Sequence, residues 1–143
     1  MSPFRYPATV KVDTAGFYLV TFPDVPEAGT DANTREEALR EAVDALSAAL
    51  GGYVHARRPI PKPSKAKPGQ AMITLPTLVT AKLALYEALR EAGLSNTELG
   101  RRLGISEGAV RRLLDLDHHS HIGQVEAGLQ ALGQRLVVDV QAA

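Results

Sequence analysis

The 143-residue sequence contains no cysteine, which excludes disulfide bonds, thiol catalysis and zinc sites built on cysteine. It also has no apolar run near the roughly 18 residues of a membrane-spanning helix, and its first ten residues lack the apolar core of a signal peptide. Apolar residues make up 45% and charged residues 22% of the chain, as in folded globular proteins. We therefore expect a cytoplasmic protein with one ordinary domain or two small ones, and no membrane partner.

The formal net charge is zero, but the charges are unevenly distributed. Residues 1–56 carry four basic and eight acidic side chains, whereas residues 57–68 carry five basic side chains and no acidic one. Residues 94–114 contain four arginines and only two glutamates. Because a surface of one charge attracts partners of the other, the acidic front is expected to bind a basic partner and the arginine-bearing stretch to bind DNA.

The first half of the chain has the pattern of a small α+β domain. "PATVKVD" and "GFYLVTFP" are β-prone segments joined by the turn-forming "DTAG", which predicts a β-hairpin. A third strand is expected around residues 29–32, and "AMITLP" is expected to return as a fourth. Between them, the capping box "TREE" predicts the start of a helix that "GG" at residues 51–52 ends. The predicted fold is an open antiparallel βββαβ sheet packed on one helix, whose apolar stripe consists of Leu39, Val43, Leu46 and Leu50.

Two domains are expected, over residues 1–76 and 77–143. The basic, proline-rich segment 57–69, "RRPIPKPSKAKPG", is assigned to the first domain and is expected to be a stiff linker with little capacity to pack, and protease-sensitive. A second binding arm is the alternative. From residue 77 the pattern is helical until "RLVVDV", residues 135–140, which has strand character. This short strand is expected either to pair across a two-fold axis or to join the chain's own sheet.

The stretch "SNTELGRRLGISEGAVRRLL", residues 95–114, predicts a helix, a tight turn and a second helix. Ser95 and Ser106 are at cap positions, and Gly104 offers the left-handed backbone that the turn requires. This spacing is typical of a helix-turn-helix motif, whose second helix lies in the major groove of DNA. A structural corner with solvated arginines is the alternative. A dimer is expected because one motif buries too little surface to bind one operator tightly.

Over about twenty residues this stretch resembles the helix-turn-helix of phage-repressor-like (Xre/Cro-type) proteins. The resemblance implies phosphate contacts from Ser95, Asn96 and Ser106, and base-edge positions for Glu107, Gly108 and Arg112. The predicted DNA-binding residues are Ser95, Asn96, Ser106, Glu107, Gly108, Arg111 and Arg112. Arg112 is suited to a bidentate contact with guanine, and Glu107 to accepting a hydrogen bond from cytosine. Gly108 departs from the usual polar residue and has no side chain with which to read a base, so modest specificity is expected.

A second resemblance covers nearly the whole chain. The hairpin, the "FPDVPE" turn, the "TREEAL" helix start, the "GGYVHARRPIPKPS" exit and the helix-turn-helix that follows are similar in order and spacing to the HicB family of antitoxins. The resemblance implies a type II antitoxin whose front domain, a partial and inactive RNase H-like fold, neutralises a HicA-like mRNA-cleaving toxin. It further implies repression of the antitoxin's own operon by operator binding, as a homodimer or higher homo-oligomer.

Inhibition of such a toxin would be occlusion, since an acidic domain can cover a surface that binds phosphate. The predicted toxin contacts are Tyr18, Phe22, Asp24 and Glu27, for each of which a core or solvated role is an equal alternative. The alternative function is a stand-alone helix-turn-helix regulator whose front domain senses a ligand or oligomerises. A basic protein of about eighty residues encoded beside this chain would favour the antitoxin.

Catalytic patterns in the sequence are weak. A metal-dependent nuclease needs several carboxylates converging on two ions about 4 Å apart, and the acidic residues of the front half are not paired on adjacent strand centres. "DHHSH", residues 117–121, crowds its candidate metal ligands into one loop. No Gly-x-Ser-x-Gly elbow supports a Ser–His–Asp triad. We therefore predict a protein that is not an enzyme, with no catalytic or metal-binding residue, no cofactor and no small-molecule substrate.

Overall fold

A computed structural model describes residues 4–143, and the chain divides into two compact units at the junction of Pro76 and Thr77. Among the described residues, no helix combines the length and the apolar character that a bilayer crossing requires.

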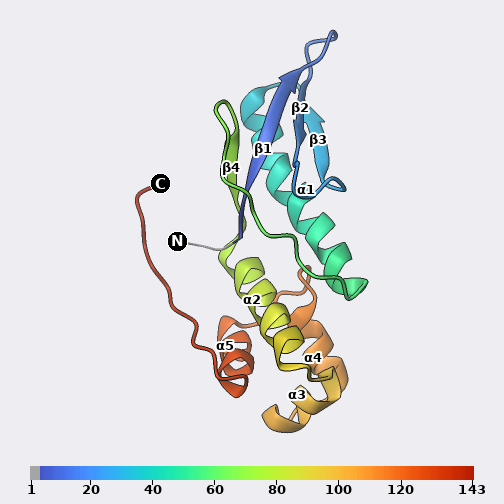
Figure 1. Cartoon of the computed structure of the whole chain (residues 1–143), viewed down its shortest axis with the longest axis vertical. Helices are drawn as coiled ribbons and strands as arrows, with labels where there is room; N and C mark the ends of the chain where they lie inside the picture. The colour runs from blue at the N-terminus through green and yellow to red at the C-terminus, as the bar shows by residue number, and fades with distance from the viewer. Residues whose placement is uncertain (1–3) are drawn as a thin grey trace. The chain divides into compact units, whose positions relative to one another are not determined.

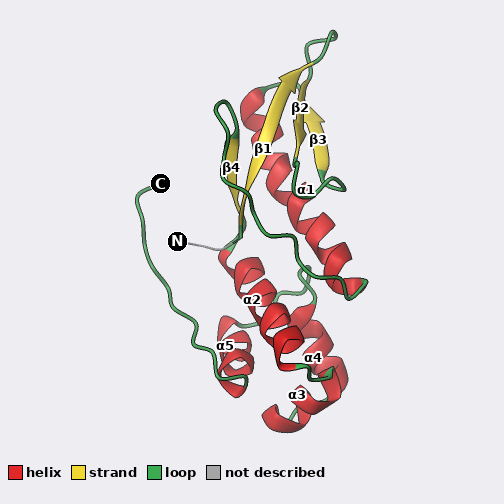
Figure 2. Cartoon of the chain, viewed as in Figure 1, coloured by secondary structure: helices red, strands yellow, loops and turns green. Residues whose placement is uncertain are grey.

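The first unit is a four-stranded antiparallel sheet with a long helix along one face (Figures 1 and 2). Its elements in chain order are β1 (Arg5–Val12), β2 (Tyr18–Thr21), β3 (Gly29–Ala32), α1 (Arg35–His55) and β4 (Ala71–Thr74). The strand order is β3-β2-β1-β4, so β3 and β4 are the edges. The predicted α+β class and the βββαβ order are confirmed.

The side of α1 that faces the sheet differs from the predicted stripe. Leu46 and Leu50 are fully buried as expected, but Leu39 and Val43 are only partly buried. The positions beside them are buried instead and carry small side chains, Ala38 and Ala42. Small side chains let the helix backbone lie close to the strands, so the stripe follows the alanines rather than the larger apolar residues.

The helix α1 does not end at its two glycines. It continues to His55, and Arg57 then takes a left-handed conformation, with φ of 58°. The Arg58 amide donates to the Tyr53 carbonyl (2.9 Å), which closes the last turn. Each glycine costs a helix interior about 1 kcal/mol relative to alanine, and burial of the Tyr53 ring, which is 6% exposed, offsets that cost.

The proline-rich segment is held against the first unit at several points, contrary to the prediction of a linker with little capacity to pack, although most of its side chains are exposed. The Ile60 side chain is only 8% exposed. The Tyr6 hydroxyl donates to the Pro61 carbonyl (2.7 Å), and the Ser64 amide and hydroxyl donate to the two oxygens of Asp24 (2.8 and 2.6 Å). An extended proline-rich chain has no internal hydrogen bonds, so its carbonyls and remaining amides are available to side chains of the sheet and turn.

The second unit is helical. It contains α2 (Thr77–Ala92), α3 (Asn96–Leu103), α4 (Glu107–Leu114) and α5 (Ile122–Ala131). The helix α2 packs against α4 and α5, and α3 packs against the same two helices. At the α2–α5 contact, a Cβ added to Gly128 would lie 2.9 Å from Leu85 Cδ1, so this glycine sets a close approach. The buried apolar core includes Leu83, Leu85, Leu89, Leu99, Val110, Leu113, Leu114, Val125 and Leu129.

The predicted C-terminal strand is not formed. Residues 135–140 run extended after α5 without strand pairing to any described residue (Figure 2). Backbone amides and carbonyls in a strand need a neighbouring strand as partner, and here the segment has none. The β-prone composition of "RLVVDV" is therefore insufficient by itself, and the alternative in which it joins the chain's own sheet is wrong for this structure.

Candidate functional site

The helix-turn-helix geometry is built from two serine caps and one glycine turn. The Ser95 hydroxyl accepts from the Glu98 amide at the start of α3 (3.1 Å), and the Ser106 hydroxyl accepts from the Ala109 amide at the start of α4 (3.0 Å). Gly104 between them has φ of 70° and ψ of 30°, the left-handed conformation. The predicted caps and turn are confirmed, and the three predicted phosphate contacts, Ser95, Asn96 and Ser106, lie at the N-termini of α3 and α4.

A close contact inside the motif fixes the position of the turn. A Cβ added to Gly100 in α3 would lie 2.7 Å from the Ile105 carbonyl oxygen and 3.4 Å from Val110 Cγ2. Backbone atoms cannot yield as a flexible side chain can, so a larger residue here would push α3 away from the turn and from α4. Sequence reasoning missed Gly100, although a glycine inside a short helix is a signal of close packing.

The exposed face of α4 carries two arginines beside a position without a side chain. Arg111 pairs with Glu107 across one helical turn, with Nη2 3.0 Å from Oε1 and the two side chains 71% and 40% exposed. An ideal Cβ on Gly108 would lie 3.8 Å from Arg112 Nη1 and 3.9 Å from Arg111 Nη2. Gly108, Arg111, Arg112 and Asp115 line an open hollow of about 180 Å³. At 3.8 and 3.9 Å, an added Cβ on Gly108 would make only ordinary van der Waals contacts with the two guanidinium groups.

A buried lysine holds the C-terminal end of α4. The Lys82 side chain of α2 is 0% exposed, and Nζ donates to the Arg112 carbonyl (2.9 Å), the Asp115 carbonyl (2.7 Å) and the Ser120 hydroxyl (2.9 Å). The last carbonyls of a helix have no partner within it and carry negative partial charge. An ammonium group satisfies both needs and ties α4 to α2. Burial lowers the pKa of Lys82, and the nearby Asp115 carboxylate opposes that shift.

Sequence reasoning missed Lys82, whose signal was a single cation within the apolar run "LVTAKLALYEAL". The histidine-rich loop at residues 117–121 supplies Ser120, one of the three acceptors of Lys82 Nζ. Ser120, which bonds Nζ of Lys82, also accepts or donates at His118 Nδ1 (3.0 Å) and donates to the Arg112 carbonyl (3.4 Å). Within residues 4–143, no group of three histidine or acidic side chains is placed to hold a metal ion.

The four predicted toxin contacts differ in exposure. Phe22 is 1% exposed and packs in the core of the first unit, as the core alternative predicts, so its side chain has almost no surface to offer a partner. Tyr18 on β2 and Asp24 are partly buried, and Glu27 is exposed. Asp24 is also occupied by both hydrogen bonds from Ser64. The turn therefore has a structural role that its sequence did not indicate.

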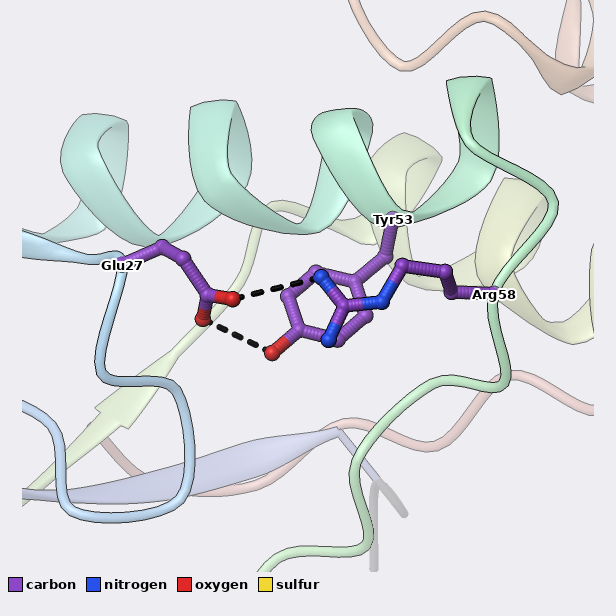
Figure 3. A network of polar contacts seen from close by, with 3 residues as sticks. All are labelled: Glu27, Tyr53 and Arg58. Carbon is purple, nitrogen blue, oxygen red and sulfur yellow. Dashed lines mark hydrogen bonds and ion pairs between the residues drawn. The ribbon is translucent and has the colours of Figure 1, made fainter.

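Glu27 belongs to a small network at the end of α1 (Figure 3). Its Oε1 accepts from the Tyr53 hydroxyl (2.7 Å), and its Oε2 lies 3.3 Å from Arg58 Nη1. The Arg58 guanidinium also lies 4.1 Å from the centroid of the Tyr53 ring. The Tyr53 hydrogen bond holds the pKa of Glu27 below its usual value, and Glu27 in turn raises the pKa of Tyr53. A glutamate distant in sequence thus holds the end of α1 and the start of the proline-rich segment.

Comparison with protein families assigns both units. A family described as HicB-like antitoxin of bacterial toxin-antitoxin systems matches residues 5–84, more than half of the chain. This chain belongs to the HicB-like antitoxin family. A second family, described as winged helix-turn-helix DNA-binding, matches residues 80–115, which span most of α2, all of α3 and all of α4. After α4 the antitoxin continues through a loop into α5, not into the β-hairpin of a wing.

Curated relatives match almost the full length. Antitoxin HicB of Pseudomonas fluorescens is 40% identical over 98% of this chain and 96% of its own. Antitoxin HicB 2 of Photorhabdus laumondii is 40% identical over 92% of this chain and 93% of its own. Antitoxin HicB of Escherichia coli K12 is 36% identical over 92% and 96%. The predicted family, the helix-turn-helix DNA-binding domain and the assignment as a non-enzymatic antitoxin are confirmed.

Proposed function

We propose that this HicB-like antitoxin neutralises a HicA-like RNA-cleaving toxin with its first unit and represses its own operon by binding operator DNA as a dimer through its second unit. The observation that carries this proposal is the pairing of a capped helix-turn-helix, with exposed arginines on α4, with a separate α+β unit of a recognised antitoxin family. The first function needs a protein surface and the second a nucleic-acid surface, and the chain supplies them in different units.

On the DNA side, Arg112 and Arg111 are the principal candidates. Both are exposed on α4, and among the described residues no carboxylate lies within ion-pair distance of Arg112. In the proposed complex, Arg112 reads a base edge and Arg111 exchanges Glu107 for DNA, while Glu107 becomes available to a cytosine amine. Ser95, Asn96 and Ser106 contact phosphates at helix N-termini, which favour anions. Gly108 has no side chain with which to contact a base.

The proposed toxin-binding unit has a different net charge once the proline-rich segment is counted as part of it. Counted with that segment, residues 1–76 carry nine basic and eight acidic side chains, so the first unit as a whole is not acidic. Apart from Glu27, which already pairs with Arg58, the exposed carboxylates of this unit lie on the edge strand β3 and the first half of α1. They are Asp31 on β3 and Glu36, Glu41 and Asp44 on α1, accompanied by Arg35 and Arg40. The Thr30 hydroxyl of β3 donates to Glu41 of α1 (3.2 Å), which joins the two elements.

We place the basic toxin on this β3–α1 surface because β3 is also an edge strand, with backbone groups open to a partner. Tyr18 on β2 and the exposed part of Glu27 remain proposed contacts at lower priority, as does Asp24, since Asp24 and Glu27 already have partners within the unit. A cluster of acidic side chains opposite a phosphate-binding surface gives both attraction and exclusion of RNA.

The test separates the two functions. The gene of a small basic protein adjacent to this one is induced with and without the antitoxin, and growth, co-purification and operator binding are measured. Arg111→Ala/Arg112→Ala should lose operator binding and retain growth rescue, whereas Asp31→Lys/Glu41→Lys should show the reverse. Arg35→Ala/Arg40→Ala is the control for DNA binding, because it removes the same charge from the first unit.

Operator affinity of the unmodified antitoxin should fall with salt, with a log–log slope of about −0.9 per phosphate contacted. A flat salt response would count against DNA binding. Operator binding without rescue or complex formation would favour the stand-alone regulator.

A further inference from the structure

The segment after α5 is the largest concentration of exposed apolar side chains in the second unit. Of the seven large apolar residues that are exposed in the described chain, three lie within four positions: Val137 (72%), Val138 (71%) and Val140 (91%). The backbone here is extended and has no paired strand among the described residues. Exposed β-prone apolar segments of this kind are templates for pairing with another chain.

We propose that residues 135–140 form an antiparallel two-stranded ribbon with the same segment of a second copy, centred on Val137. In this register Val137 lies opposite its own equivalent, and Leu136 lies opposite Val138 of the partner subunit. Arg135 lies opposite Asp139 of the partner subunit, and two-fold symmetry repeats that pair. The inference rests on the proposed operator-binding dimer and specifies its interface.

Charge and side-chain alternation select this register. Successive side chains of a strand point to opposite faces, so Leu136, Val138 and Val140 share one apolar face. Arg135, Val137 and Asp139 share the other, where the only two charges of the segment meet opposite charges across the two-fold axis. The neighbouring two-fold registers are centred on Leu136 or on Val138. The first would place Arg135 opposite Val137 and Asp139 opposite Gly133, and the second would place Arg135 opposite Gln141 and Asp139 opposite Val137, so neither gives the two charges an opposite charge as partner.

A second copy of the chain fits the segment better than an unrelated partner. Pairing about a two-fold axis requires that a sequence be complementary to its own reverse, and the order Arg, Leu, Val, Val, Asp meets that condition at both charged positions. A two-stranded ribbon by itself is only marginally stable in water. The interface is therefore expected to include adjoining surface of α5, where Ile122 is 43% exposed.

The decisive experiment uses charge exchange in the full-length chain, with molecular mass measured by analytical ultracentrifugation. Arg135→Asp places two like-charge pairs in the dimer, and so does Asp139→Arg. For each variant alone, the dissociation constant of the dimer should be at least about tenfold higher than for the unmodified protein, because like charges directly opposite are destabilising. When the two variants are mixed, every cross-strand pair is again of opposite sign, and heterodimers should form with nearly the original affinity.

Arg40→Asp makes the same charge change on α1 and should leave association unchanged. Circular dichroism verifies that each variant retains its helices. A monomeric unmodified protein, single variants that associate normally, or a mixture that forms no heterodimer would each overturn the proposed interface. If the variants still form dimers and bind the operator, the interface fails while the proposed function stands. If the unmodified protein does not bind the operator, the proposed function itself is contradicted.

Discussion

The two units hold their irregular segments in opposite ways. In the second unit, one fully buried ammonium group, Lys82 Nζ, has three protein acceptors and fixes the end of α4 together with the loop that follows. In the first unit, the proline-rich segment is held near its start by Glu27 and Arg58, whose side chains are 47% and 54% exposed. Both devices order a segment that secondary structure alone would leave loose.

The buried contacts of Lys82 and the exposed Glu27–Arg58 pair differ in whether water can replace a lost partner. If an exposed ion pair is broken, water solvates both groups, so such pairs contribute at most about 1 kcal/mol. If a buried donor is removed, its acceptors remain buried without a partner, and each such acceptor costs about 1–3 kcal/mol. We therefore expect large effects at Lys82 and small ones around Glu27, although the contacts of Lys82 (2.7–2.9 Å) and of Glu27 (2.7–3.3 Å) are of similar length.

Lys82→Met should produce the largest loss. Methionine fills much of the space but donates no hydrogen bond, so the carbonyls of Arg112 and Asp115 lose their buried partner. Relief of the desolvation of Lys82 offsets part of the cost, and we expect a decrease of about 2 kcal/mol in the free energy of unfolding, measured by urea titration. Operator affinity should fall as well, because the end of α4 is released. Lys11→Met, at an exposed position, is the control; equal stability of the two variants would contradict the role of Lys82.

Gly100→Ala should produce the next largest effect. The added methyl group would lie 2.7 Å from the Ile105 carbonyl oxygen, so backbone must move. Such overpacking costs about 1–3 kcal/mol, and it should lower both the melting temperature and operator affinity. Gly123→Ala in α5, where an added Cβ meets nothing within 4 Å, should cause no loss. A Gly100→Ala protein as stable as this control would show that the turn can shift freely.

The sequence predicted the parts of these units that depend on local chemistry. The caps at Ser95 and Ser106 and the left-handed turn at Gly104 follow from residues adjacent in the chain, and they were found. The roles of Lys82 and Gly100 depend on carbonyl groups supplied by other elements, and a local pattern does not contain that information. Helix α1 continues beyond Gly51 and Gly52 to His55 because Tyr53 is buried against other elements, and the local sequence does not show that burial.

The two extended segments, residues 57–69 and 135–140, also show that composition alone does not predict packing. The proline-rich segment lacks any apolar periodicity, yet Asp24 and Tyr6 give its backbone partners. The segment 135–140 has the composition of a strand, yet the described chain gives it no partner strand. Composition indicates which conformation a segment can adopt, while the presence of partners decides whether it packs.

Asp24→Ala should have a small effect on global stability and a larger local one. It removes the acceptor for the Ser64 amide and hydroxyl, both at the protein surface, and we expect a loss of about 1 kcal/mol or less. Limited proteolysis with a protease of broad specificity should cut residues 57–69 faster than in the unmodified protein. Asp13→Ala, which disrupts a hairpin turn elsewhere in the unit, is the control. Unchanged cleavage of the segment would show that Asp24 does not hold it.

The smallest expected effect is a pH dependence from Glu27. Because the Tyr53 hydrogen bond lowers the pKa of Glu27 in the folded protein below the ordinary 4.5, the unfolded state binds more protons between the two pKa values. The Glu27 contribution to stability is therefore fully present above pH 4.5 and is lost as the pH falls through the lowered folded pKa. Glu27→Gln cannot titrate, so its unfolding free energy should decline less steeply with acid over that window. Tyr53→Phe removes the main cause of the shift and should reduce the slope in the same direction. If both variants follow the acid profile of the unmodified protein, the network is a contact without energetic coupling.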